Sequence, residues 1–105
     1  MQQQQLDLAQ INRAFRELAE RKAWQAYHTP KNLAAAVSVE AAELLENFQW
    51  LSDEQAAALK HNVEAKVKIA DEVADVLMYL VELCARMEID MADAIAQKIR
   101  KNDKK

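Results

Sequence analysis

The chain has 105 residues, no glycine and a single proline, Pro30. Glycine and proline interrupt helices most strongly, so long stretches of this chain contain no helix breaker. Alanine, leucine, glutamate, glutamine and lysine are all abundant, and each of them favours helices. Nothing in the composition favours strands. The sequence therefore predicts an all-α protein.

Length and charge set the broad class of the protein. A chain of this size is expected to form one domain over residues 1–105. Its formal net charge of −3 gives no basic surface for a nucleic-acid polymer. No apolar run approaches the roughly 20 residues that cross a bilayer, and residues 1–5 lack the charged and apolar regions of a signal peptide. We therefore expect a cytoplasmic protein with no membrane partner.

Apolar periodicity and capping signals divide the chain into helices. Pro30 ends the first helix, because the residue before a proline is pushed out of the helical region. Ser52 with Gln55 three residues later has the pattern of a capping box, and Asp90 is the expected N-cap of the last helix. The boundary near residues 61–62 stays open. The expected helices span roughly residues 6–27, 31–48, 53–60, 63–87 and 91–101.

Four carboxylates form two matched pairs on the second and fourth of these helices. Glu40 and Glu43 form one pair, and Glu72 and Asp75 form the other. Each pair has the i, i+3 spacing that places two side chains on one helix face. The first acid of each pair lies at the margin of the apolar stripe, and both helices share this phase. Acids of a purely solvated face usually lie opposite the core. The pattern favours acids that line a groove beside a packed interface.

A metal site and a solvated acidic face are the two interpretations of these acids. Chance alone produces E-x-x-E in glutamate-rich helices. Four converging carboxylates repel one another, however, and a divalent cation with oxygen ligands removes that repulsion. A di-iron site needs a histidine three residues after an acid, and neither helix has one. The residues thus indicate Mg²⁺, with Mn²⁺ as a substitute, and a phosphate-bearing substrate.

Further segments around the acids match known patterns. They are Trp24-Gln25-Ala26-Tyr27-His28-Thr29-Pro30-Lys31-Asn32-Leu33, Leu45-Glu46-Asn47-Phe48-Gln49-Trp50, Asp71-Glu72-Val73-Ala74-Asp75-Val76-Leu77-Met78-Tyr79-Leu80 and Lys98-Ile99-Arg100-Lys101-Asn102. Together with the 28 residues between the acid pairs, they resemble the all-α nucleoside triphosphate pyrophosphohydrolases of the MazG type. The dCTP pyrophosphatase-like subgroup is the most similar. The resemblance covers roughly residues 14–102.

The resemblance implies a MazG-like bundle of four to five helices that cleaves a nucleoside triphosphate between its α- and β-phosphates. The products are a monophosphate and pyrophosphate, and such an enzyme clears unwanted nucleotides from the pool. The four acids would bind Mg²⁺, and one of them or Glu46 would orient the attacking water. Lys98 and Tyr79 would contact phosphate or sugar oxygens. The resemblance assigns the nucleobase contacts to Trp24, His28, Trp50 and Asn102.

Two departures from the family pattern leave the base open. The tail stops soon after Asn102, without the R-Y-P-like extension common in longer relatives. Phe15 stands where some relatives that favour cytosine carry a histidine. Both a dCTP-like and a dATP-like substrate therefore remain as alternatives. Two other functions also remain as alternatives. One is a non-catalytic helical interaction module with a solvated acidic face. The other is a phosphatase that releases orthophosphate from the γ-position.

The apolar content predicts association with further copies of the chain. Apolar residues make up 51% of the sequence, and a domain of this size has limited capacity to bury them. Leu77, Val81 and Cys84 widen the apolar stripe of the long helix beyond what one partner helix covers. As the family resemblance also implies, we expect a homo-oligomer, a dimer or a tetramer, with site residues from more than one copy.

Overall fold

The computed structural model describes residues 5–105 and is entirely helical over that range. This confirms the predicted fold class. The glutamines at positions 2–4, which entered the prediction that no signal peptide is present, lie outside the described residues. The helices are α1 (Leu8–Arg21), η1 (Gln25–Tyr27), α2 (Pro30–Glu46), α3 (Asp53–Ala58), η2 (Leu59–His61), α4 (Val63–Arg86) and α5 (Met91–Asp103), where η denotes a 3-10 helix.

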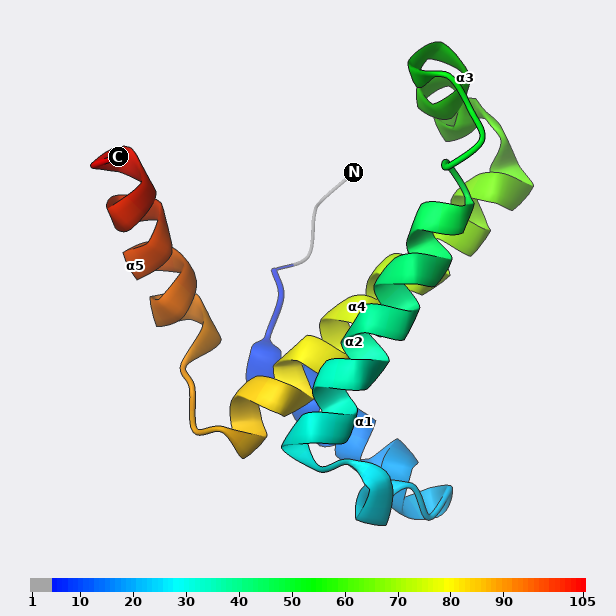
Figure 1. Ribbon diagram of the computed structural model, residues 1–105. Coiled ribbons are helices and arrows are strands. Elements are labelled where there is room, and N and C mark those ends of the chain that lie inside the picture. The colour runs from blue at the N-terminus through cyan, green and yellow to red at the C-terminus, as the bar shows by residue number, and fades with distance from the viewer. Residues whose placement is uncertain (1–4) are drawn as a thin grey trace.

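Helices α2 and α4 form the centre of the molecule. They run antiparallel and pack along their lengths, with α3 and η2 connecting them at one end (Figure 1). Helix α1 packs on the C-terminal half of α4, near the opposite end of this pair. Helix α5 extends away from the other helices (Figure 1). The α2–α4 pair is therefore the part of the fold that brings the two acid-bearing helices together.

Each α-helix begins at a side chain that accepts a hydrogen bond from the first turn. Ser52 and Gln55 form the predicted capping box at the start of α3. The predicted cap Asp90 starts α5 by accepting from the Asp93 backbone N–H at 3.0 Å. Thr29 and Asn62 cap α2 and α4 in the same way. These caps explain why the starts of the later helices agree closely with the sequence prediction.

The predicted end of the first helix is wrong. We expected it to continue to about Tyr27, but α1 ends at Arg21. The chain turns at Ala23, which has a left-handed φ of 58°. The Trp24 backbone N–H donates back to the Ala19 carbonyl at 2.8 Å, and Ala23 N–H donates to Glu20 at 3.1 Å. This is a Schellman ending, in which glycine is the usual residue. Without a glycine, the sequence pattern gave no signal of the turn.

The hydrophobic core of a single chain is small. Among residues 5–105, only Phe15, Ala19, Leu33 and Val81 are fully buried apolar side chains. They lie where α1, α2 and α4 meet. Within the same range, no helix has the length and the apolar character that crossing a bilayer requires. Most other large apolar side chains remain partly or fully exposed, and helix α5 contributes no buried residue.

Candidate active site

The four predicted acids converge across the α2–α4 interface. Burial raises the pKa of Glu40, and a hydrogen bond with Glu43 raises it further. The negative charges of Glu43, Asp75 and Glu72 act on it in the same direction. The charges of all three other acids therefore affect the pKa of Glu40, and two of these acids, Glu72 and Asp75, come from the opposite helix. The structure brings together the two pairs that the sequence predicted to face one groove.

Asp75, on α4, also has a raised pKa, because it is partly buried and close to other acids. Burial raises its pKa, followed by the charges of Asp71, Glu43 and Glu72. Like charges held this close disfavour ionisation, because each added charge is repelled by the others in a region with less water. Without a counter-ion, the cluster costs free energy at neutral pH. A bound cation would remove that cost.

Two oxygen atoms of the cluster are buried without a hydrogen-bond partner. Within residues 5–105, these are Oε2 of Glu40 and Oε2 of Glu72. The other oxygen of Glu72 accepts a hydrogen bond from Asn47 Nδ2 at 3.0 Å. Asn47 Nδ2 also lies 3.1 Å from the Leu44 carbonyl, which fixes the amide at the end of α2. Buried carboxylate oxygens usually have a partner, so these two atoms are free to serve as ligands.

The donor set fits a hard divalent cation. Carboxylate oxygens alone suit Mg²⁺ or Mn²⁺, and Mg²⁺ keeps several positions for water and substrate oxygens. Among residues 5–105, however, no three acid, histidine or cysteine side chains lie close enough together, as placed, to hold a metal ion. A cation bound to these carboxylates would keep coordination positions for water and for a phosphate-bearing substrate.

An aromatic cluster adjoins the acids. Burial raises the pKa of Tyr79, and so do the charges of Glu40 and Asp75. The Tyr79 ring meets Phe15 edge-on, with the ring centroids 5.3 Å apart, and meets His28 at 6.0 Å. Phe15 and His28 stack nearly parallel at 5.4 Å. The cluster links the acid site on α2 and α4 to helix α1 and to the segment before α2.

The two tryptophans of the predicted base pocket lie at opposite ends of α2. Trp24 precedes this helix and contacts His28, with the ring centroids 6.4 Å apart. Trp50 follows the helix and is 86% exposed. A helix of 17 residues is about 25 Å long, so one chain does not bring both indoles to one base. The predicted pocket thus requires Trp24 and Trp50 from different copies.

The remaining predicted residues are exposed. Glu46 is the last residue of α2, one turn beyond Glu43, and its side chain faces solvent. Lys98 and Asn102 lie on α5, which extends away from the acid-bearing helices (Figure 1). Within one chain, the structure therefore does not bring Lys98 or Asn102 to the acids.

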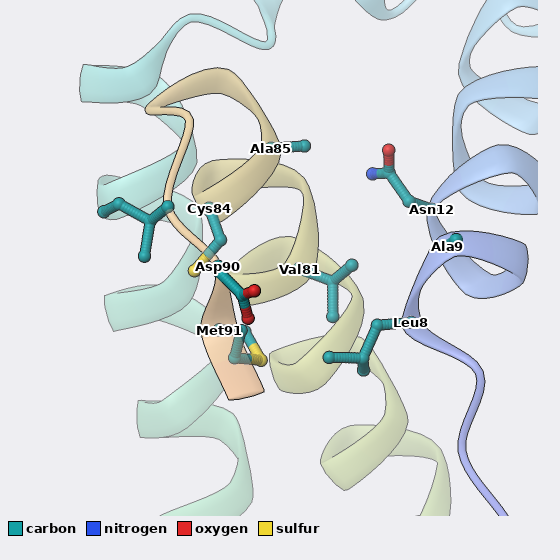
Figure 2. Close-up of a pocket in the computed structure, with 9 residues that line it drawn as sticks. Leu8, Ala9, Asn12, Val81, Cys84, Ala85, Asp90 and Met91 are labelled. Atoms are coloured by element: carbon teal, nitrogen blue, oxygen red, sulfur yellow. The ribbon is translucent and has the colours of Figure 1, made fainter. Parts of the chain in front are cut away.

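A cavity of about 240 Å³ lies beside this arrangement, between the start of α1, the end of α4 and the start of α5 (Figure 2). Its walls are mostly apolar, and they include Leu8, Val81, Cys84 and Met91. Such walls offer little to a triphosphate. The chemistry of the site is therefore assigned to the acids and the aromatic cluster rather than to this cavity.

Comparison with known proteins identifies the family. Residues 35–105 match the MazG-like family. The chain belongs to the MazG-like family. This confirms the family that the sequence motifs predicted. In structure it is similar to a pyrophosphatase from Archaeoglobus fulgidus DSM 4304, with a TM-score of 0.81 and 39% identity. That match covers 99% of this chain and 95% of the other.

Two curated relatives are similar over most of this MazG-like chain. dCTP pyrophosphatase 1 of Rattus norvegicus is 36% identical over 95 residues, which are 90% of this chain and 56% of the relative. dCTP pyrophosphatase 1 of Homo sapiens is 35% identical over 92 residues, which are 88% of this chain and 54% of the relative. The chain thus spans about half the length of these relatives.

Two site features of this MazG-like chain were missed at the sequence level. Asn47, which holds Glu72, lies four residues after Glu43 on the same helix face, and that spacing was a usable signal. Glu82 is almost completely buried and binds two arginines. It continues the stripe of Asp75 and Tyr79 on α4 at i+3 from the tyrosine. A polar residue in phase with a predicted site is the signal that could have found it.

Proposed function

We propose that this MazG-like protein is a nucleoside triphosphate pyrophosphohydrolase. The reaction would add water across the bond between the α- and β-phosphates and release a nucleoside monophosphate and pyrophosphate. The observation that carries the proposal is the convergence of four acids from α2 and α4. Two of these acids have a buried oxygen without a hydrogen-bond partner within residues 5–105. The similar proteins, named as a pyrophosphatase and as dCTP pyrophosphatases, support it.

The proposed cofactor is Mg²⁺, with Mn²⁺ as a substitute. Glu40, Glu43, Glu72 and Asp75 would hold it through carboxylate oxygens. Bound there, the cation would supply positive charge that offsets the triphosphate and makes the α-phosphorus more electrophilic. Asn47 holds one oxygen of Glu72 and so leaves the other oriented for binding.

The side chains have separate roles in this proposal. One of the four acids, or Glu46 one turn beyond Glu43, would orient the attacking water and accept its proton. The raised pKa of Tyr79 keeps its hydroxyl protonated, so that it can donate to a phosphate or sugar oxygen.

Nucleotide binding is proposed to require at least two copies of the chain. Trp24 and His28 would contact the base from one copy, and Trp50 would come from another, because α2 separates the two indoles. Lys98 and Asn102 would reach the phosphates and the base edge in the same way. The assembly is a homodimer or a homotetramer, and the substrate is a (deoxy)nucleoside triphosphate with a dCTP-like or dATP-like base. Its role would be to clear unwanted nucleotides from the cellular pool.

Product analysis tests the reaction. Each common NTP and dNTP is incubated with the protein and Mg²⁺, and the products are separated by ion-exchange chromatography. The proposal expects monophosphate and pyrophosphate in equal amounts, and none with EDTA or with the Glu43→Ala variant. A diphosphate with orthophosphate would instead identify a γ-phosphatase. If calorimetry detects no saturable, Mg²⁺-dependent binding of a non-hydrolysable dNTP, the interaction-module alternative is favoured.

A further inference from the structure

A polar cavity of about 250 Å³ lies next to the aromatic cluster, between α1, η1 and α4. Of its wall, the function proposed above uses only His28. Both cations and acids line it, and so do groups that accept or donate hydrogen bonds. The polar residues of its wall are Arg16, Glu20, Gln25, His28, Glu82 and Arg86.

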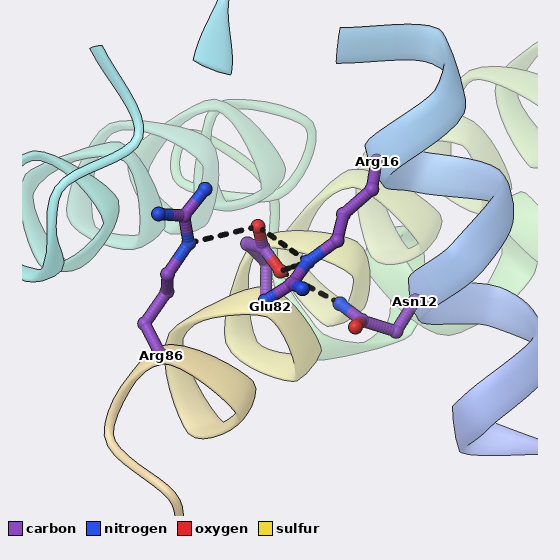
Figure 3. Close-up of polar contacts among 4 residues, drawn as sticks. All are labelled: Asn12, Arg16, Glu82 and Arg86. Carbon is purple, nitrogen blue, oxygen red and sulfur yellow. Dashed lines mark hydrogen bonds and ion pairs between the residues drawn. The ribbon is translucent and has the colours of Figure 1, made fainter. Parts of the chain in front are cut away.

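Glu82 anchors the wall of this cavity. The side chain is only 1% exposed, yet its pKa is lowered. Burial alone would raise it, but hydrogen bonds from Asn12, Arg16 and Arg86 outweigh that effect. Asn12 Nδ2 donates to Oε1 at 2.8 Å, Arg16 Nε lies 2.7 Å from the same oxygen, and Arg86 Nε donates to Oε2 at 3.2 Å (Figure 3). The carboxylate is thus ionised and supplied with donors on both oxygens.

The two arginines retain donors for a ligand. A guanidinium carries five N–H groups in a planar fork, and both arginines use Nε to contact Glu82. The terminal nitrogens of Arg86 point away from the carboxylate (Figure 3). The arginine side chains are 45% and 35% exposed, so a ligand can reach them. Glu82 therefore acts as a fixed support that orients two groups of N–H donors at the cavity.

A buried histidine nitrogen supplies an independent sign of a ligand. His28 lines the cavity and is 8% exposed. Within residues 5–105, its Nδ1 is buried without a hydrogen-bond partner. Buried polar atoms are usually hydrogen-bonded, so this nitrogen has the capacity for one more hydrogen bond.

The position of the cavity follows the order of groups in a nucleotide. Asp75, Tyr79, Glu82 and Arg86 are spaced by four, three and four residues, so they share one face of α4. The rise from Asp75 to Glu82 is about 10 Å. The face therefore presents metal-binding acids, then a phenol, then His28 packed on that phenol, and then the donor-rich cavity. Phosphates, sugar and base follow one another in the same order.

We propose that this cavity receives the edge of the nucleobase and favours a base with carbonyl acceptors on that edge, guanine above all. The inference rests on the proposed function, but it replaces the dCTP-like or dATP-like base named there with guanine. The terminal N–H groups of Arg16 and Arg86 match the O6 and N7 acceptors of guanine, whereas adenine presents an amino group beside N7. Glu20, the second acid of the wall, can accept from the N–H groups on the neighbouring edge of guanine.

Lysine variants test the cavity without removing the charge that Glu82 needs. Arg16→Lys and Arg86→Lys keep a cation beside the buried carboxylate but lose the planar fork. Arg13→Lys is the matched control, because Arg13 is an exposed residue of the same helix that does not line the cavity. We expect the wild type to prefer dGTP over dATP in kcat/KM by about tenfold, the scale of one bidentate contact. Either cavity variant should reduce this ratio at least about fivefold, and the control should leave it unchanged.

Nucleoside binding separates failure of this inference from failure of the proposed function. Calorimetry in the presence of EDTA measures the binding of guanosine and of adenosine to the protein. These nucleosides carry no phosphate, so their binding needs no metal. If dNTPs are hydrolysed without a preference for dGTP, or with one that neither variant alters, the cavity inference is overturned and the enzyme function stands. If no nucleotide is hydrolysed, the proposed function fails. Guanosine binding that Arg16→Lys weakens would then still support the cavity, and binding of inorganic phosphate alone would overturn it.

Discussion

At the scale of single residues, the acid cluster destabilises the metal-free chain but suits the binding of a cation. Within the described part of the chain, Glu40 and Glu72 each bury an oxygen without a hydrogen-bond partner. Burial and the neighbouring negative charges raise the pKa of Glu40 and of Asp75. Such an arrangement is unfavourable for an isolated chain, because each carboxylate is repelled by its neighbours. The same arrangement is favourable for a cation. Removal of one acid should therefore have opposite effects on activity and on metal-free stability.

Replacement of Glu43 or Asp75 by alanine tests this directly. Activity with Mg²⁺ should fall at least about a hundredfold, because metal-assisted charge stabilisation contributes several kcal/mol. The melting temperature in EDTA should hold or rise, since one repelling charge is gone. Steady-state kinetics and thermal melts measure the two effects. Glu17→Ala, at an exposed acid on α1, is the control and should change neither. Near-normal turnover in either variant would remove that residue from the ligand set.

Trp50 offers a second residue test because it is 86% exposed in a single chain. If it stacks on the base, Trp50→Ala should raise KM more than it lowers kcat, because stacking is shared by ground and transition states. The expected loss is roughly 1–3 kcal/mol. Initial rates over a range of dNTP concentration provide both constants. An unchanged KM would contradict a role in the base pocket.

The acids were predictable from sequence, and their supporting residues were only partly so. The i, i+3 spacing and shared phase of the two pairs are properties of single helices, so the sequence displays them. Asn47 and Glu82 act through partners on other helices, at 25 and 66 residues' separation. Which polar side chains meet across an interface depends on the packing of two helices. The phase of one helix alone does not determine it.

At the scale of secondary-structure elements, helix starts were easier to predict than helix ends. Side-chain caps such as Ser52 and Asp90 are visible in sequence because only a few residue types serve as caps. The ends of α1 and α4 instead use left-handed residues, Ala23 with φ 58° and Glu88 with φ 54°. Neither residue type favours that conformation. Within residues 5–105, two helices thus end at turns that no glycine marks, and of these two ends only that of α1 was predicted wrongly.

Glycine at these two endings should stabilise the protein. A residue with a Cβ pays about 1 kcal/mol in the left-handed region, and the greater freedom of glycine in the unfolded chain offsets part of that gain. Ala23→Gly and Glu88→Gly should each add about 0.5 kcal/mol to the free energy of unfolding. Urea denaturation measures the change. Ala34→Gly, at an exposed position inside α2, should instead lose about 1 kcal/mol. A loss at Ala23 equal to that at Ala34 would contradict the argument.

The contribution of the Glu82 contacts between α1 and α4 to the free energy of unfolding should depend on pH. Hydrogen bonds in the folded state lower its pKa below the ordinary value of 4.5. Ionised Glu82 therefore stabilises the fold above the unfolded pKa, and this contribution is lost as pH falls through the lower folded pKa. Glu82→Gln should reduce the free energy of unfolding by about 2 kcal/mol at pH 7. The deficit should shrink as the pH falls below 4.5.

Urea titrations of the wild type and of Glu82→Gln at pH 7, 5 and 4 measure this deficit. Glu17→Gln is the control, because Glu17 is an exposed acid on the same helix as Arg16. Its difference from the wild type should stay near zero at each pH. A Glu82→Gln deficit that is constant with pH would mean that the lost contact is not one made by the ionised carboxylate.

At the scale of the whole molecule, a single chain exposes too much surface. Its accessible area is 8482 Å², whereas a compact monomer of 12.0 kDa is expected to expose about 6,000 Å². Its radius of gyration is 16.0 Å, compared with about 13 Å for a compact chain of this length. The sequence predicted the apolar surplus. It did not predict that α5 extends away from the other helices, because an apolar stripe does not specify what covers it.

Association of at least two copies would bury this surplus and complete the site. Val73 of α4 and Ile95 and Ile99 of α5 are at least half exposed in one chain, and they offer apolar surface to a second copy. The same association would bring Lys98 of α5 to the acids of a neighbouring copy. Sedimentation velocity at micromolar concentration should therefore show a dimer or a tetramer. A fully active monomer would contradict both the assembly and the shared site.

Subunit mixing tests whether the site is shared between copies. Glu43→Ala damages the acid cluster and Lys98→Ala damages the basic helix, so each variant alone should have little activity. When the two are denatured together and refolded as a mixture, half of the dimers contain both chains, and each of these has one intact site. About a quarter of wild-type activity should return. Glu43→Ala mixed with Asp75→Ala is the matched control, because both changes lie in an acid cluster formed within one chain. That mixture should stay inactive. No recovery in the first mixture would show that Lys98 does not act on a neighbouring copy's acids. Recovery in the control would contradict an acid cluster formed within one chain.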